Sequence, residues 1–326
     1  MPDRIMSCAA ALAEALHEEM TRDETIFILG EDLTAHAGVF GQFKGIPEIF
    51  PGRIIDTPIS ETGIVGIGLG SALTGMRPIV DLHFADFVTC AMDELANQAA
   101  KIRYMLGGQV SVPMVIWCPD GAGLRAAAQH SQSLEAWFVH TPGLKVVVPS
   151  APADVKGLIK SAIRDDNPVI VFQHKKFFAT AGPVPEGDYT IPLGQAAVKQ
   201  AGKDVTLLSY GSGVYLCQKA RCELGELSID AEVVDLRTLK PLDMALVAES
   251  IKKTHRVVIV HEACLTGGFG AELAARIQDE LFDYLDAPIK RVAAGDFPIP
   301  FSPPLEDFVL PKVSDVIKAT REVTYR

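Results

Sequence analysis

Short, uninterrupted runs of apolar residues alternate along this chain with segments of helical period. Residues 5–21 carry an apolar side chain every three or four positions, which predicts an amphipathic helix. Apolar runs predict buried strands at 25–29, 78–82, 113–118, 145–148 and 169–172. Helical patterns occur at 61–75, 88–106, 131–139 and 152–164. Residues 33–53 show no clear period and are expected to form a loop. This alternation predicts an α/β fold with a parallel sheet covered on both faces.

A second series of strands and helices follows a segment dense in proline and glycine at 179–194, which indicates a linker or domain boundary. Strands are expected at 204–209, 232–236 and 257–260, and helices at 214–227, 243–253 and 270–285. A length of 326 residues also suits two domains. We therefore predict domains at 1–185 and 190–326, each a mainly parallel sheet covered by helices.

Composition excludes several kinds of partner. The formal net charge of −11 argues against nucleic acid or an anionic membrane as the main partner. No apolar run approaches the roughly 18 residues of a membrane span, and the N-terminus lacks a signal-peptide layout. The six cysteines include no Cys-x-x-Cys pair, so neither a zinc site nor a disulfide framework is indicated. We expect a cytoplasmic protein with reduced thiols.

Glu61 stands directly before a helix that is rich in Gly, Ala and Leu. One interpretation is structural: Ser60 or Thr62 caps the helix, and Glu61 is a first-turn acid that the helix dipole favours. The other is functional, because the apolar run behind Glu61 would desolvate the carboxylate and favour its neutral form. The glycines of this helix do not form a dinucleotide fingerprint, since Ser71 occupies the third slot. They instead favour close packing on a neighbour.

Three further clusters could carry chemistry. His130 has amide and hydroxyl neighbours that could hold one tautomer for proton transfer, or it could be a structural histidine. Phe84 and Phe87 could form an aromatic wall for a flat heterocycle, or be ordinary core residues. The glycines of 267–270 follow His261-Glu262 and could bind an anion or form a tight turn. No nucleophile elbow or phosphate loop is present, which excludes common hydrolase and ATPase readings.

Taken together, several stretches resemble the beta subunit of a thiamine-diphosphate-dependent 2-oxo acid or acetoin dehydrogenase. They cover nearly the whole chain in the family's order, and the most specific are ISETG and AAQHSQ. The stretches are GED (30–32), DTPISETGIVG (56–66), FADF (84–87), NQAAKIRYMLGG (97–108), AAAQHSQS (126–133), PGLKVVVPS (142–150), KGLIKSAIRDDNPVI (156–170), VDLRTLKPLD (234–243) and PIPFSPPLE (298–306).

The resemblance implies a transketolase-like fold, with a thiamine pyrimidine-binding domain at 1–185 and a transketolase-like C-terminal domain at 190–326. It also implies a heterotetramer of two alpha and two beta chains, with thiamine diphosphate bound between subunits. Glu61 matches the acid that hydrogen-bonds the ring nitrogen of the aminopyrimidine and so promotes loss of the thiazolium proton. His130 matches the histidine that assists proton transfer and passage of the acyl group to a lipoyl acyltransferase.

Other matched positions line the cofactor or an ion. Phe87 matches the aromatic residue that packs on the aminopyrimidine, with Glu31, Ile59, Ser60 and Phe84 beside it. A potassium ion is bound by backbone carbonyls in some relatives, and a plain structural turn is the alternative here. The matching positions in this chain are Met114, Ala162, Ile163, Asp165 and Asn167.

One motif of thiamine enzymes does not match. They hold the magnesium diphosphate with Gly-Asp-Gly and a later Asn, whereas this chain has only Gly295-Asp296-Phe297, in the wrong domain. The resemblance thus implies that the alpha subunit holds most of the Mg²⁺ diphosphate, and that this chain is silent alone. In its Leu-Arg pair at 124–125 the chain resembles acetoin dehydrogenases more than pyruvate dehydrogenases, which implies acetoin as substrate, with pyruvate close behind. Half of a split transketolase and a non-catalytic docking subunit remain as alternatives.

Overall fold

The computed structural model describes residues 4–326, which divide into two compact units. Unit 1 runs to Asp120 and resumes at Trp137–Leu193, and unit 2 comprises Gly121–Ala136 and Gly194–Arg326. The short segment Gly121–Ala136 therefore belongs structurally to unit 2, although its neighbours in sequence on both sides belong to unit 1. We call Gly121–Ala136 the exchanged segment, and it matters for function because it contains His130.

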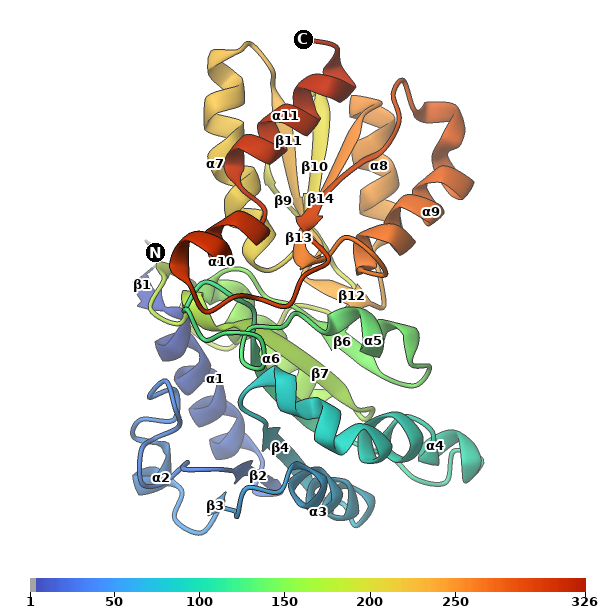
Figure 1. Ribbon diagram of the computed structural model, residues 1–326. Coiled ribbons are helices and arrows are strands. Elements are labelled where there is room, and N and C mark those ends of the chain that lie inside the picture. The colour runs from blue at the N-terminus through green and yellow to red at the C-terminus, as the bar shows by residue number, and fades with distance from the viewer. Residues whose placement is uncertain (1–3) are drawn as a thin grey trace. The chain divides into compact units, whose positions relative to one another are not determined.

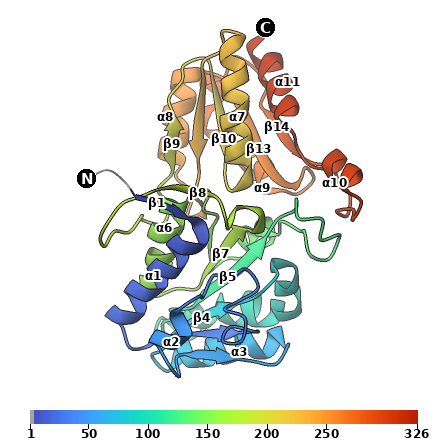
Figure 2. The same cartoon turned by 90° about the vertical axis from the view of Figure 1, so that its left-hand side faces the viewer.

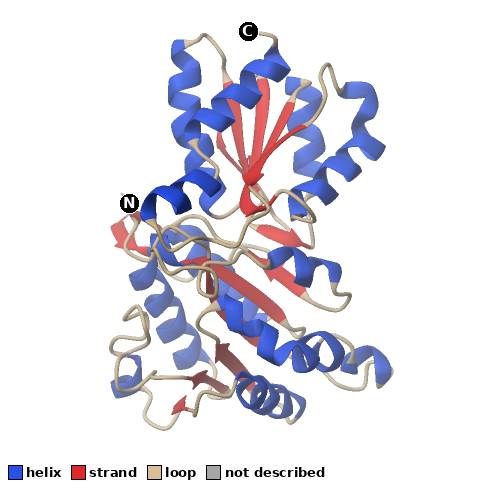
Figure 3. Ribbon diagram, viewed as in Figure 1, coloured by secondary structure: helices blue, strands red, loops and turns tan. Residues whose placement is uncertain are grey.

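Unit 1 is built on a parallel sheet with the strand order β6-β7-β5-β4-β2-β3 (Figures 1 and 3). A separate antiparallel pair joins β1 to β8. The strands are β1 (Arg4–Ser7), β2 (Ile26–Gly30), β3 (Ile54–Asp56), β4 (Arg77–Asp81), β5 (Val115–Asp120), β6 (Lys145–Val147), β7 (Val169–His174) and β8 (Ala181–Val184). The helices are α1 (Cys8–Arg22), α2 (Ile46–Ile49), α3 (Glu61–Leu73), η1 (Ala85–Ala91), η2 (Asp93–Ala99), α4 (Ile102–Met105), α6 (Pro152–Arg164) and η3 (Lys175–Phe177), while α5 (Glu135–His140) begins in the exchanged segment.

Helices cover both faces of this sheet, as the apolar strands predict. Helices α1 and α6 pack together over alternate strand residues such as Ile28 and Trp117. Helix α3 packs on β4, where a Cβ on Gly68 would lie 2.5 Å from Val80 Cγ2. The predicted close packing of the α3 glycines is therefore confirmed at Gly68.

Three helices predicted before residue 140 differ from the structure. The helix expected at 5–21 opens as strand β1, and α1 starts at Cys8 because Ser7 Oγ accepts from Ala10 N at 3.1 Å. The segment 88–106 divides into a 3₁₀ helix, a π-helix and a short α-helix, which an apolar period alone does not distinguish. The helix expected at 131–139 begins only at Glu135, because Gln132 O accepts from Gly121 N.

Unit 2 has a sheet with the order β14-β13-β10-β11-β9, parallel except for edge strand β9. Helices α7 and α11 cover one face, and α8 and α9 cover the other (Figures 1 and 2). The strands are β9 (Ala197–Gln200), β10 (Val205–Ser209), β11 (Ala231–Asp235), β12 (Thr238–Lys240), β13 (Val257–Cys264) and β14 (Lys290–Ala294). The helices are α7 (Ser212–Glu226), α8 (Met244–Thr254), α9 (Phe269–Leu281), η4 (Phe282–Tyr284), α10 (Pro303–Val309) and α11 (Val313–Thr324).

Between residues 4 and 326, no helix combines the length and the apolar character that a membrane crossing requires. All six cysteines lie in this range and all are free thiols. Cys8, Cys118 and Cys217 are buried, whereas the other three are exposed.

Candidate functional site

The carboxyl ends of β2 and β4 bring acidic groups together in unit 1. A Cβ on Gly30 would lie 2.7 Å from Asp81 O, so only glycine permits this approach of the two strand ends. Glu31 follows Gly30 and is half-buried. Burial raises the pKa of Glu31, and the negative charge of Glu61 raises that pKa further, while His83 opposes the rise. Glu31 and Glu61 are therefore electrostatic neighbours.

Glu61 is the first residue of α3 and is half-buried. The two hydroxyls expected to cap this helix do not do so. The Ser60 side chain makes no capping hydrogen bond, and Thr62 Oγ1 donates instead to Cys90 O at 2.7 Å. The capping interpretation is thus wrong for both hydroxyls, and Glu61 stands at a helix start whose free N–H groups favour an acid without a side-chain cap.

Two aromatic residues lie near this helix start in the fold. Phe87 belongs to η1, which packs on α3 and is tied to its first turn by the Thr62–Cys90 hydrogen bond. Phe84 precedes η1, with Lys175 Nζ 4.9 Å from its ring centroid. Both phenylalanines are half-buried, so neither is an ordinary core residue. The Ile59 side chain is 79% exposed and offers apolar surface beside the acid.

A buried acid–histidine pair interacts electrostatically with Glu31. His83 Nδ1 is 2.9 Å from Asp81 Oδ2, and both side chains are nearly inaccessible to solvent. Burial raises the pKa of Asp81, while the hydrogen bond with His83 opposes the rise. Burial lowers the pKa of His83, but Asp81 more than offsets this, so the pKa of the imidazole is raised overall. No role was predicted for His83 from the sequence, where the only signal is a histidine two residues after an aspartate that ends a strand.

His130 lies in unit 2, on the loop formed by 121–134. The loop is closed at its base, where Gly121 N donates to Gln132 O at 3.1 Å. His130 N donates to Ala127 O at 3.3 Å, and Ala127 has a φ of +61°, so the histidine sits at the end of a tight turn. His130 is half-buried.

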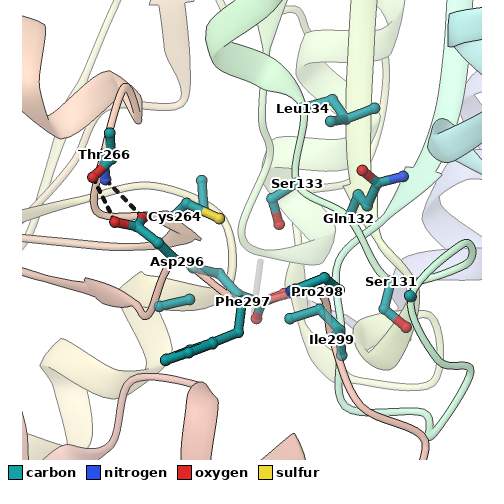
Figure 4. A pocket seen from close by; sticks show the side chains of 14 residues that line it. Ser131, Gln132, Ser133, Leu134, Cys264, Thr266, Asp296, Phe297, Pro298 and Ile299 are labelled. Atoms are coloured by element: carbon teal, nitrogen blue, oxygen red, sulfur yellow. Dashed lines mark hydrogen bonds between the residues drawn. The ribbon is translucent and has the colours of Figure 1, made fainter.

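A cavity of about 550 Å³ adjoins this loop within unit 2 (Figure 4). Loop residues on one side face the ends of β13 and β14 on the other, with Phe297 and Pro298 between them. Asp296 is fixed there because its carboxylate accepts from Thr266 N and Thr266 Oγ1, at 3.1 and 2.5 Å. The lining residues are Ala128, Ser131, Gln132, Ser133, Leu134, Glu262, Ala263, Cys264, Thr266, Ala294, Asp296, Phe297, Pro298 and Ile299.

The glycine segment after His261 serves packing. His261 is fully buried and stacks on Tyr210, with ring centroids 6.0 Å apart. Burial lowers the pKa of His261 to about 4. A Cβ on Gly268 or Gly270 would lie 2.8 or 2.4 Å from the imidazole, so both glycines permit the backbone to cover the ring. The structure therefore favours the turn interpretation over an anion site.

Four of the five positions matched to a potassium site lie in the last turn of α6 or in the segment directly after it, and the fifth, Met114, directly precedes β5. Ala162 and Ile163 lie in the last turn of α6, where carbonyls have no intrahelical partner. Ile163 O and Asp165 O accept from Arg77 Nη1 at 3.0 and 3.1 Å, which leaves each oxygen a second lone pair. Asn167 N donates to Asp165 Oδ1 at 2.9 Å. Among the described residues, no group of three or more His, Cys, Asp or Glu side chains could hold a metal ion.

Comparison with known proteins shows the family to which the chain belongs. The transketolase pyrimidine-binding domain family matches residues 5–179, and the transketolase C-terminal domain family matches residues 194–316. Pyruvate dehydrogenase E1 component subunit beta of Rhizobium meliloti is 44% identical, covering 98% of this chain and 70% of the relative. The beta subunit of acetoin:2,6-dichlorophenolindophenol oxidoreductase from Cupriavidus necator is 45% identical, covering 98% and 97%. The chain belongs to the transketolase-like beta subunits of 2-oxo acid and acetoin dehydrogenases.

A solved structure agrees with this assignment at the level of the fold. A split-gene transketolase, described as an inactive beta4 tetramer, superposes with a TM-score of 0.79 at 25% identity, covering 98% of both chains. As a dehydrogenase beta subunit, the chain is an oxidoreductase component. Its pyrimidine-domain match includes 121–136, so the loop that carries His130 belongs to that domain by sequence but to unit 2 by packing.

Proposed function

We propose that this chain is the beta half of a thiamine-diphosphate-dependent dehydrogenase with two alpha and two beta chains, acting on acetoin or pyruvate. The observation that carries the proposal is Glu61, an acid at the start of α3 with no side-chain cap and a second acid, Glu31, as electrostatic neighbour. The full-length similarity to dehydrogenase beta subunits supports the same conclusion. The cytoplasm is the compartment we propose, in agreement with six free thiols.

The residues around Glu61 suit the aminopyrimidine of thiamine diphosphate. Exposed Ile59 and half-buried Phe87 offer apolar surface to a flat heterocycle, and a carboxyl group beside them can bind its ring nitrogen. When bound, the cofactor supplies an electron sink for cleavage next to a carbonyl. Glu61 would hydrogen-bond the ring nitrogen through its carboxyl group, and Phe87 would pack on the ring. Glu31, Ser60 and Phe84 complete this half of the cofactor site.

The remaining half of the cofactor site comes from the alpha subunit in this proposal. The chain lacks the Gly-Asp-Gly motif for a magnesium diphosphate, so Mg²⁺ is held mainly by the partner. Potassium is proposed at the end of α6, because the backbone oxygens of a helix C-terminus suit a hard cation. Its ligands would be carbonyls of Met114, Ala162, Ile163, Asp165 and Asn167.

His130 acts after the carbon–carbon bond is broken. The two-carbon unit is oxidised while the disulfide of a lipoyl group is reduced, so one sulfur takes the acyl group and the other takes a proton. We assign delivery of that proton to His130, because histidine is the side chain that most often transfers protons in enzymes and this one is half-buried at the end of a tight turn. The acceptor is the lipoyl domain of an acyltransferase core.

A split transketolase is the second candidate, favoured by the superposition on a split-gene transketolase. The identity there is 25%, against 44–45% to dehydrogenase beta subunits. A transketolase half would transfer two-carbon units between sugar phosphates and would need no acyltransferase. A purely docking subunit is the third candidate, and it would not need Glu61, Phe87 and His130.

Co-expression with a cognate alpha chain tests the proposal. Turnover should be absent from the purified chain and should appear, dependent on thiamine diphosphate, once the alpha chain is added. Acetoin, pyruvate and branched 2-oxo acids are compared as substrates, and sugar phosphates serve as the transketolase control. Turnover by the chain alone would contradict the split site, and activity only with sugar phosphates would establish the second candidate.

A further inference from the structure

Two carboxylates from different elements accept hydrogen bonds from consecutive backbone amides of the loop that carries His130. Glu262, on β13, accepts from Ala122 N at 2.6 Å. Glu306, on α10, accepts from Gly123 N at 2.8 Å. The second oxygen of Glu262 accepts from Ser212 Oγ at 3.0 Å, which fixes that carboxylate to the start of α7. The base of the loop is thus bound directly to β13 and α10, and Glu262 links it indirectly to α7.

Glu306 is the more unusual of the two because its side chain is fully buried. A buried carboxylate is costly unless it is paired and hydrogen-bonded, and both partners of Glu306 come from the loop. They are the Gly123 amide and the guanidinium of Arg125, which also lies 2.8 Å from Asp307 Oδ1. Any opening of the loop would leave this buried charge without its partners.

The far end of the loop is held by a third buried group. Tyr210 Oη donates to Glu135 Oε1 at 2.7 Å, and both side chains are buried. Hydrogen bonds to carboxylates are stronger than those between neutral groups, so the loop is fixed by charged acceptors at both ends. Arg125 and Ala127 nevertheless keep φ values of +60° and +61°, which the flanking contacts must maintain.

We propose that Glu262 and Glu306 are positioning residues that clamp the loop 121–134 in the conformation that presents His130. The expected effect of the clamp on acyl transfer rests on the proposed role of His130. Its effect on the loop itself is independent of that role. Neither carboxylate touches substrate in this proposal. They act by holding the turn that ends at His130, and Arg125 completes the clamp by neutralising Glu306.

The experiment compares Glu306→Ala and Arg125→Ala with a matched control, Glu232→Ala. Glu232 is also a fully buried carboxylate of unit 2, bound by Gly202 N and Ser250 Oγ, away from the loop. Arg125 is 36% exposed, so its removal keeps the test available if Glu306→Ala does not fold. Glu306→Gln keeps an acceptor oxygen for Gly123 N and should recover much of the loss.

Amide hydrogen exchange is measured on the full chain, and turnover on the complex with the alpha chain. Exchange at 122–134 should rise about tenfold or more in both loop variants and stay unchanged in Glu232→Ala. Turnover is read with 2,6-dichlorophenolindophenol, which accepts electrons without a lipoyl group, and with a lipoylated domain. Lipoyl-coupled turnover should fall about tenfold more than dye-coupled turnover.

Unchanged exchange at 122–134 would overturn the clamp. Faster amide exchange together with equal losses of dye-coupled and lipoyl-coupled turnover would overturn the role of the clamp in positioning His130. His130→Ala is run in parallel to separate this failure from a failure of the proposed function. If His130→Ala also leaves the ratio of the two assays unchanged, the role assigned to His130 is wrong, and the exchange result still decides whether the clamp exists.

Discussion

The two regions that carry the candidate chemistry are built in opposite ways. Around Glu61, the helix start lacks a side-chain cap, Ile59 is exposed and the flanking aromatics are half-buried. Around His130, buried carboxylates hold the loop at both ends. The first region leaves apolar and acidic surface for something else to cover. The second is fixed by contacts within its own unit.

This difference fits a division of labour between chains. A surface that binds cofactor together with a partner subunit has no need to be covered before assembly. A loop that must meet a mobile lipoyl arm gains from being rigid beforehand, since ordering it during the reaction would cost free energy. The region around Glu61 should therefore respond to the partner and the cofactor, and the region around His130 to changes in its own supports.

The largest stability effect is expected at His261, which is buried in unit 2. Its pKa of about 4 lies below the ordinary 6.5, so the unfolded chain binds the proton first as pH falls. The free energy of unfolding should drop by about 3 kcal/mol between pH 6.5 and 4, from about 1.4 kcal/mol per pKa unit. His261→Phe should flatten this part of the pH profile in thermal melts, whereas exposed His140→Gln should leave it unchanged. A profile of the same slope in both variants would show that His261 titrates normally.

Removing His130 tests the second region directly. His130→Ala should lower acylation of a lipoylated domain roughly a hundredfold, because one general acid contributes about that much. Dye-coupled turnover should change far less, since the substrate is cleaved before the lipoyl group reacts. Quenched-flow measurement of both steps gives the ratio. Equal losses in the two steps would remove the distinction between the regions.

Much of the fold was predictable because its signals are local. The apolar strands and helix α6 follow directly from their periods, and the family resemblance is carried by contiguous motifs. Edge elements were missed: β9 is half-exposed and mixed in pattern, and the helix α10 that carries Glu306 is only seven residues long. Elements this short contain too few repeats of the apolar pattern to be predicted from the sequence.

The candidate site was predicted less completely, because its supports come from distant parts of the chain. Glu306 and Gly123 lie 183 residues apart, and nothing in either local pattern indicates that they meet. Similarly, the capping interpretation at Thr62 failed because its hydroxyl donates to Cys90 O, 28 residues away. Residue type and local order identified the groups that carry chemistry, whereas only the folded chain identifies what holds them.

The smallest expected effect is a difference in stability between variants at two helix starts of unit 1. Ser7 Oγ accepts from Ala10 N, so Ser7→Ala should cost about 1 kcal/mol of stability. Ser60 makes no capping bond, so Ser60→Ala should change stability by less than about 0.5 kcal/mol. Urea unfolding of the two variants gives the difference. A larger loss for Ser60→Ala would restore its capping role and weaken the case that this helix start is kept for a ligand.

Proton exchange at the thiazolium carbon of bound cofactor tests the central claim most directly. In the complex of Glu61→Gln with the alpha chain, exchange followed by NMR should slow by at least about a hundredfold, because the amide cannot supply the carboxyl proton. Circular dichroism and assembly should match the unmodified complex. Unchanged exchange in a well-folded variant would contradict the account and return Glu61 to the role of a first-turn acid.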